Sequence, residues 1–437
     1  MHRPRFMFLL ALFLIIFSAS GRAQNMAPAS ANPLDAARAA ISSGRLEDAK
    51  KILNSVPESK VDINDLDFLR GTLAVDNGDY DTAIIYFRAI LARKPELNRV
   101  RLDLARAFYL KGDDAVAEYH FHLAEAAGLP PAAQANVDKI LNEIKRRKKW
   151  GVDASFGIEP STNINSATNA QTVDLYGTPY QLSQSAQKTS GVGVVGSLAG
   201  SYQFDLTTNS RLMVGSSVNG TDYIHHNFDD NSANAFIGPR ILIGQASEAT
   251  VEATATERWL GGQDYYTGGG GRVEGKTTLT PRLQLDGAVA VQQLNYSSNF
   301  SAFTGPVTTL STGATYGLDA QSFVRLDGAV IHEQTAVAAF RDMQYYIGPN
   351  YYREFPHGFT GNLGVNADFA YFDAPLAAFG VKRHDTTMNY QVGVSNRTIN
   401  LFGFMPVVTY IHTNRYSDIP LDAFNSDRVI LGATQNF

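Results

Sequence analysis

Apolar and polar residues alternate with a period of two in the chain after Trp150. One stretch has apolar residues or glycine at Leu283, Leu285, Gly287, Val289 and Val291, with Arg282, Gln284, Asp286, Ala288, Ala290 and Gln292 between them. Residues 359–371 repeat the pattern. Side chains of a β-strand point alternately to the two faces of a sheet, so we expect strands with one face against lipid and the other against polar surroundings.

Such strands can be placed over most of the chain after residue 149, and they number fourteen. They cover residues 150–159, 189–204, 211–224, 231–243, 248–260, 265–278, 281–296, 307–318, 321–332, 343–355, 358–373, 380–396, 401–415 and 426–437. An open sheet in lipid would leave its edge amides without hydrogen-bond partners, so we predict a closed antiparallel transmembrane β-barrel. An even strand number returns both barrel ends to the periplasmic side, as in bacterial single-chain barrels.

The connections between these strands alternate in length. Short turns are predicted at residues 280–281, 319–320 and 356–357, whereas the longer connections include 160–188, 297–306, 333–342 and 416–425. Short periplasmic turns alternating with longer outer loops are typical of a bacterial outer-membrane barrel.

The last predicted strand has apolar residues at alternate positions, although Gln435 interrupts the series, and it ends at Phe437. This terminal aromatic strand resembles the one that the barrel-assembly machinery reads. We therefore expect Phe437 to be the barrel-assembly signal.

The chain before Trp150 has a different period. Gly44, Gly78 and Gly112 are spaced 34 residues apart, and each is followed five residues later by alanine. A period of 34 is that of tetratricopeptide repeats, in which two antiparallel helices form one unit. We expect about three helix pairs and a final helix over residues 132–148, which together form a short tetratricopeptide-like helical repeat domain.

Stacks of such helix pairs have a concave face that commonly binds an extended chain. The repeat frame places six candidate groove residues on this face: Asp65, Phe68, Asp76, Arg99, Arg106 and Tyr109. Either they form a groove for a substrate, or they are solvated charges and helix-packing residues.

The first residues predict export. Arg3 and Arg5 precede an apolar run over residues 6–17, and small residues lie around Ala23. This run is too short to cross a bilayer, which needs about 20 residues. We therefore predict a secretory signal peptide over residues 1–23.

Three parts follow from these patterns. The signal peptide covers residues 1–23, the periplasmic helical domain covers 24–149 and the transmembrane β-barrel covers 150–437.

A basic run at 145–149 ends the last helix beside Trp150. The cations suit the negative end of a helix dipole, and at a membrane boundary they would also attract anionic outer-membrane lipid.

Composition restricts the chemistry. A mean hydropathy of −0.16 fits a barrel, because lipid-facing and lumen-facing residues alternate along each strand. A net charge of −5 argues against nucleic-acid binding. The absence of cysteine excludes disulfides, thiol catalysis and the lipid-attachment residue of a lipoprotein.

Candidate chemical sites are weak. His120 and His122 are two positions apart on a predicted helix and so face different ways, and His225-His226 falls in a predicted outer loop. The glycines over 268–271 lack the Lys-Ser/Thr of a phosphate loop, and we expect them to relieve crowding or bend a strand. We expect no enzyme activity, metal or cofactor.

The order of these parts resembles the surface lipoprotein assembly modulator family, Slam, also called type XI secretion. The stretches that carry the resemblance are residues 101–108, 129–131, 163–165, 415–420 and 427–428. The resemblance covers nearly the whole mature chain, and the order of the stretches carries more weight than any single motif. The short N-terminal region departs from the family by leaving room for few repeats.

This resemblance implies an outer-membrane translocon for surface lipoproteins, or for related secreted host-interaction or metal-uptake proteins. Its implied partners are the exported substrate, the barrel-assembly machinery and outer-membrane lipid, and we expect a monomer without a cofactor. Two alternatives remain open: an exopolysaccharide exporter, which usually carries many more repeats, and a passive porin with a periplasmic scaffold domain.

Overall fold

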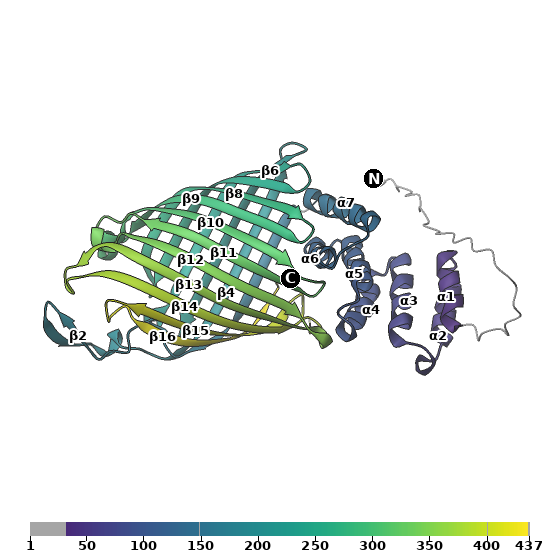
Figure 1. The fold of residues 1–437 in the computed structure, drawn as a ribbon, viewed down its shortest axis with the longest axis horizontal. Helices are drawn as coiled ribbons and strands as arrows, with labels where there is room; N and C mark the ends of the chain where they lie inside the picture. The colour runs from purple at the N-terminus through teal and green to yellow at the C-terminus, as the bar shows by residue number, and fades with distance from the viewer. Residues whose placement is uncertain (1–31, 148, 400, 436–437) are drawn as a thin grey trace, which may run out of the picture.

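The structure, a computed structural model, describes residues 32–147, 149–399 and 401–435, and consists of a helical part followed by a β-barrel (Figure 1). The described helical part contains seven α-helices and one 3-10 turn. They are α1 Pro33–Ser42, α2 Leu46–Ser55, η1 Glu58–Lys60, α3 Ile63–Asp76, α4 Tyr80–Arg93, α5 Asn98–Lys111, α6 Asp114–Ala126 and α7 Pro131–Arg147. The predicted order of helix pairs plus a final helix is confirmed.

Glycine ends the first helix of each pair. Gly44, Gly78 and Gly112 have φ angles of 71°, 76° and 96°, in the left-handed region that favours glycine. Gly71 in α3 has another role, because an added Cβ would lie 2.6 Å from the ring of Phe87 in α4. The 34-residue period therefore reflects helix termination, and the small residue at position 71 lets α3 and α4 pack closely.

The second part is a closed antiparallel barrel, formed by fourteen strands of the described residues. Its strands are β1 Trp150–Ser161, β4 Gly191–Asp205, β5 Ser210–Tyr223, β6 Asp230–Ile243, β7 Ser247–Leu260, β8 Gln263–Thr280, β9 Leu283–Tyr296, β10 Gly305–Gly317, β11 Ser322–Glu333, β12 Asp342–Glu354, β13 Phe359–Leu376, β14 Val381–Asn396, β15 Met405–Ser417 and β16 Phe424–Thr434. Each strand pairs with its neighbours in this order, and β1 closes the barrel against β16. The predicted strand number and topology are thus confirmed.

The long connection after β1 contains a feature that its polar composition did not predict. Strands β2 Thr172–Leu175 and β3 Thr178–Gln181 form a separate hairpin there. The backbone N–H of Tyr176, at the tip of this hairpin, donates a hydrogen bond of 2.8 Å to the carbonyl of Ala378 in the loop between β13 and β14. The hairpin is therefore attached to a distant part of the barrel rim.

The period-two pattern separates the two barrel faces. Val289 and Val291 of β9 are 47% and 50% exposed on the outer surface. On the same strand, Asp286 forms a 2.8 Å ion pair with Arg325 of β11. A Cβ at Gly313 of the intervening β10 would lie 2.6 Å from the Asp286 carboxylate, so the glycine leaves room for this pair.

Glycines 268–271 lie within β8, as expected for a strand. An added Cβ at Gly270 would collide with the carbonyl oxygen of Val291 on β9. Gly268 and Gly270 therefore relieve crowding between strands, and the four glycines lie in a strand and do not form a phosphate loop.

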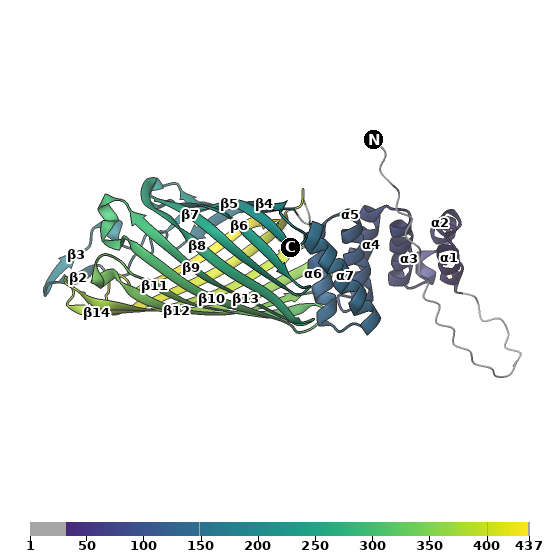
Figure 2. The same ribbon diagram turned by 90° about the horizontal axis from the view of Figure 1, so that it is seen from above.

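The helices stack against one end of the barrel, with α6 and α7 nearest to it and α1 and α2 farthest away (Figures 1 and 2). This end carries most of the short turns, whereas the β2–β3 hairpin lies at the opposite end. The alternation of lengths is not complete, because the connection between β7 and β8 at the opposite end has two residues and the β14–β15 connection at the helix end has eight. In the described part of the chain, no helix is long and apolar enough to cross a membrane. The predicted signal peptide, residues 1–23, and Phe437 lie outside the described residues.

Candidate functional site

Helix α6 lies directly against the turn end of the barrel. A Cβ at Gly317, the last residue of β10, would collide with the Cβ of Ala126 at the end of α6. The ring of His122 in α6 lies 3.3 Å from the amide nitrogen of Gln284 in β9. Close backbone approach and a polar contact therefore fix α6 on this rim.

A buried polar cluster joins the helices to the barrel beside this contact. We call it the docking cluster, and its members are Arg101 of α5, Tyr119 of α6, Tyr352 and Glu354 of β12, and Arg397 in the β14–β15 connection. Residues from the helical part and from two separate barrel hairpins thus meet at one carboxylate.

Glu354 is the centre of the docking cluster and is only 4% exposed. One of its oxygens lies 2.8 Å from the guanidinium of Arg101, and the other accepts a 2.7 Å hydrogen bond from the Tyr119 hydroxyl. Arg397 forms a second ion pair with Glu354 and donates a 3.3 Å hydrogen bond to Tyr119. Burial of a carboxylate is unfavourable unless its lone pairs are satisfied, and these three partners satisfy them.

Burial also sets the protonation of the helical residues here. It raises the pKa of Tyr119 well above its usual range, and the neighbouring Glu354 charge acts in the same direction. It lowers the pKa of His120 well below its usual range, with a further contribution from the cation Arg101. Tyr119 is therefore a neutral hydrogen-bond donor and His120 a neutral imidazole at ordinary pH.

The local sequence explains how Arg101 reaches the cluster. It lies one residue after Val100 and three before Leu104, within the buried stripe of α5, and is itself fully buried. Its guanidinium also donates a 3.0 Å hydrogen bond to the carbonyl of Pro95, in the loop before the helix. Arg101, a cation within an apolar stripe of α5, was the one local sign of this site in the sequence.

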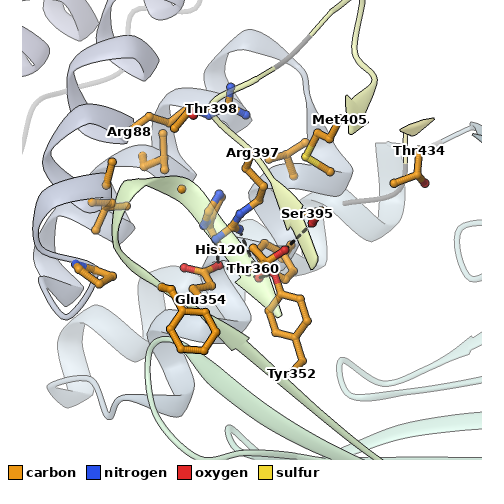
Figure 3. A pocket seen from close by; sticks show the side chains of 18 of the residues that line it. Arg88, His120, Tyr352, Glu354, Thr360, Ser395, Arg397, Thr398, Met405 and Thr434 are labelled. Atoms are coloured by element: carbon orange, nitrogen blue, oxygen red, sulfur yellow. Dashed lines mark hydrogen bonds and ion pairs between the residues drawn. The ribbon is translucent and has the colours of Figure 1, made fainter. Parts of the chain in front are cut away.

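A cavity of about 320 Å³ opens beside the docking cluster (Figure 3). Its polar lining includes Arg88 of α4, His120, Glu354 and Arg397, and its apolar lining includes Leu91, Val116, Phe355 and Met405. Helices α4 and α6 form one side, and the β12–β13 and β14–β15 connections form the other. The cavity is therefore a product of docking and belongs to neither part alone.

A second polar junction fixes the connection between the two parts. Arg211 of β5 donates a 2.9 Å hydrogen bond to the carbonyl of Lys145 and another to that of Arg146, at the end of α7. Lys149 forms a 2.6 Å ion pair with Asp205, the last residue of β4. The basic run thus contacts the barrel rim in addition to suiting the helix dipole.

The candidate groove residues lie on α3 and α5. Asp65, Asp76, Arg99 and Arg106 are exposed, whereas Phe68 and Tyr109 are half-buried. Arg99 stacks on the ring of Phe68 at 5.2 Å, and Arg147 stacks on that of Tyr109 at 4.2 Å. None of the six candidate groove residues belongs to the docking cluster, so the two are separate sets of residues.

Asp103 lies near two of these cations. Burial raises its pKa to about 6, while the charges of Arg99 and Arg106 act in the opposite direction. The α5 surface therefore mixes both signs of charge near neutral pH.

Sequence reasoning missed Tyr119, Glu354 and Arg397, because their contacts join positions more than 230 residues apart in the chain. His120 and His122 were considered only as metal ligands, but they line the contact between helices and barrel. Within residues 32–147, 149–399 and 401–435, no group of three or more His, Asp or Glu side chains is placed to hold a metal ion.

Comparison with known proteins gives a family match over the barrel. The model of the family described as surface lipoprotein assembly modifier matches residues 150–437. The surface lipoprotein assembly modifier of Pasteurella multocida is 20% identical over 406 residues, which cover 85% of this chain and 76% of the relative. Surface lipoprotein assembly modifier 1 of Neisseria meningitidis serogroup B is 21% identical over 402 residues, which cover 85% and 75%.

Among solved structures, the chain matches the outer membrane channel DcaP of Acinetobacter baumannii. It has a TM-score of 0.41 and 8% sequence identity, over 65% of this chain and 96% of the channel.

Proposed function

Because this chain belongs to the surface lipoprotein assembly modifier family, we propose that it is an outer-membrane translocon that delivers lipoproteins to the cell surface. The barrel lies in the outer membrane. The observation that carries the proposal is the docking cluster, which fixes a helical domain over the turn end of the barrel. A passive pore has no need of a domain held in this position.

The proposed orientation places the short turns and the helices in the periplasm and the long loops outside. An exported lipoprotein would meet the helical domain first, at the exposed α3 and α5 residues, and then enter the barrel. The barrel-assembly machinery would insert the chain, which would act as a monomer in contact with outer-membrane lipid. The proposal requires no catalytic group, because transport through a barrel breaks no covalent bond.

Surface display of a lipoprotein tests this function. The chain would be expressed with a lipoprotein encoded beside it, in a bacterium without a family member, and the lipoprotein on intact cells would be measured by antibody labelling and protease shaving. We expect display with the chain and none with an unrelated porin at equal abundance. Equal display in both strains would refute the translocon.

The porin alternative makes a different prediction for purified protein. Liposomes that contain the full chain would swell rapidly in sugar solutions if the barrel were a passive pore. Since the helices cover the turn end, we expect swelling far below that given by an equal amount of an open porin. Swelling at the porin rate would favour the scaffolded pore.

A further inference from the structure

The cavity beside the docking cluster has an excess of positive charge in its lining. Arg88, Arg397 and Glu354 are the charged residues of its described lining, and Arg101, which pairs with Glu354, lies outside that lining. Glu354 pairs with Arg101 and Arg397. Among the lining residues that the structure describes, two cations and one carboxylate give a net charge of +1, since His120 and Tyr119 are neutral.

Arg88 is the cation that this carboxylate does not neutralise. Its guanidinium stacks on the ring of Phe108 at 5.1 Å, and no ion pair within 4 Å joins it to a carboxylate of the described residues. The nearest acidic influence is Asp113, which already pairs with Lys111 at 3.0 Å. Arg88 and Arg397 line the same cavity, and burial, followed by the charge of Arg397, lowers the pKa of Arg88.

A second observation also indicates a missing acceptor. The Nε of Arg101 is buried and has no hydrogen-bond partner in the described part of the chain. Buried polar groups are nearly always hydrogen-bonded, so this nitrogen is an unsatisfied donor in the docking cluster next to the cavity, although Glu354 pairs with the same guanidinium.

We propose that the cavity is a binding site for a small organic anion, with its carboxylate or phosphate group held between Arg88 and Arg397 and its apolar body against Leu91, Val116 and Met405. Guanidinium groups bind both kinds of anion through paired N–H donors. The apolar walls favour an anion with a hydrocarbon or aromatic body over an inorganic ion. This site goes beyond the proposed transport function and does not depend on it.

Binding can be measured on the full chain in lipid nanodiscs by ¹⁹F NMR. The probes are 4-fluorobenzoate, 4-fluorophenyl phosphate and the neutral 4-fluorobenzyl alcohol. We expect saturable line broadening for at least one anion and none for the alcohol. Broadening by benzoate alone would identify a carboxylate site, and broadening by the phosphate alone would identify a phosphate site.

Three variants locate the site. Arg88→Gln should weaken anion binding at least tenfold, whereas Arg88→Lys should retain part of it, and Arg38→Gln, on the exposed surface of α1, should change nothing. Thr398→Trp would fill the cavity from an exposed turn position without removing a charge, so it tests the site even if Arg88→Gln fails to fold. Equal binding of the alcohol, no binding of either anion, or unchanged binding in folded Arg88→Gln and Thr398→Trp would overturn the proposal.

Discussion

The carboxylate of Glu354 lies 2.8 Å from the guanidinium of Arg101, and neither side chain is more than 4% exposed. Glu354 ends a barrel strand and Arg101 belongs to a helix more than 250 residues earlier. Undocking would break this ion pair and expose both charges to water, whereas removal of one partner in the docked state would leave the other charge buried and unpaired. The helical domain and the barrel are therefore energetically coupled.

Replacement of Glu354 by glutamine should release the helical domain. The variant leaves Arg101 and Arg397 buried without their carboxylate, and loss of one partner of a buried ion pair costs about 3 to 5 kcal/mol. We expect faster trypsin cleavage at the basic residues between α7 and β1 and a lower melting temperature of the helical circular-dichroism signal. The heat-dependent gel shift of the barrel should stay unchanged.

The matched control for this variant is Glu58→Gln. Glu58 also pairs with an arginine, Arg70, at 3.0 Å, but its side chain is 62% exposed. Exposed pairs contribute little, so this variant should behave as the parent chain. Equal effects of both substitutions would show that the docking cluster does not hold the domain.

His122 should make the stability of the helical domain depend on pH. Burial alone would lower its pKa, but hydrogen bonds and charges of Glu118 and Glu125 outweigh it and raise the pKa from 6.5 to about 9. Because the pKa of His122 is higher in the folded than in the unfolded state, its protonation stabilises the folded state fully when the pH is below the unfolded pKa. This stabilisation is lost as the pH rises from about 6.5 through 9. We expect the helical melting temperature to fall across this range.

His122→Gln should flatten that pH dependence. His226, in an outer connection, is 82% exposed, and His226→Gln is the control that should leave the slope unchanged. A scan that begins above pH 6.5 also avoids Asp103, whose pKa is about 6. A slope that persists in His122→Gln would assign it to other groups.

Capture of substrate by the helical groove can be tested with a triple variant. Replacement of Arg99, Arg106 and Tyr109 by alanine should reduce surface display of the lipoprotein while barrel abundance in the membrane stays constant. Barrel abundance should stay constant because Arg99 and Arg106 are exposed and do not form part of the docking cluster.

Packing must be separated from capture in this experiment, because Arg147 stacks on the ring of Tyr109. Tyr109→Phe keeps that ring and should preserve abundance, and a paired Arg38→Ala and Arg45→Ala variant controls for lost surface cations. Normal display at normal abundance in the triple variant would exclude capture by these residues.

Deletion of Phe437 should lower insertion of the barrel into the outer membrane. A terminal aromatic residue is the expected assembly signal, and β16 is the strand that closes the barrel against β1. Periplasmic protease sensitivity and the heat-dependent gel shift measure the outcome, and Phe437→Tyr is the control that keeps an aromatic end. Insertion at the parent level would show that the preceding residues suffice.

The barrel could be predicted from the sequence because lipid imposes a repeating constraint on every strand. Val289 and Val291 belong to the alternate positions that face lipid, and Asp286 belongs to the other set, which faces the lumen. The helix pairs could also be predicted, since Gly44, Gly78 and Gly112 mark helix ends through their backbone conformation. The β2–β3 hairpin was missed because its strands are four residues long and only Val173 among their residues is buried.

The docking cluster could not be predicted in the same way. Nothing near Glu354 in the sequence distinguishes it from a solvated turn residue, and its burial arises only when Arg101 and Tyr119 arrive from the helices. A single sequence contains the periodicities of each part, but the contacts between parts follow from three-dimensional packing.

The connection from α7 to β1 is very short, with two residues between Arg147 and Trp150. A chain of this length spans only about 11 Å when fully extended. If the docking cluster opened, the helical domain could rotate about this short connection, but it could not diffuse away from the barrel rim. The local concentration of each half of the interface would stay high, so closure would be rapid and would need no recruitment. The turn end of the barrel could thus open for one exported substrate and close again while the helical domain stays attached to the barrel.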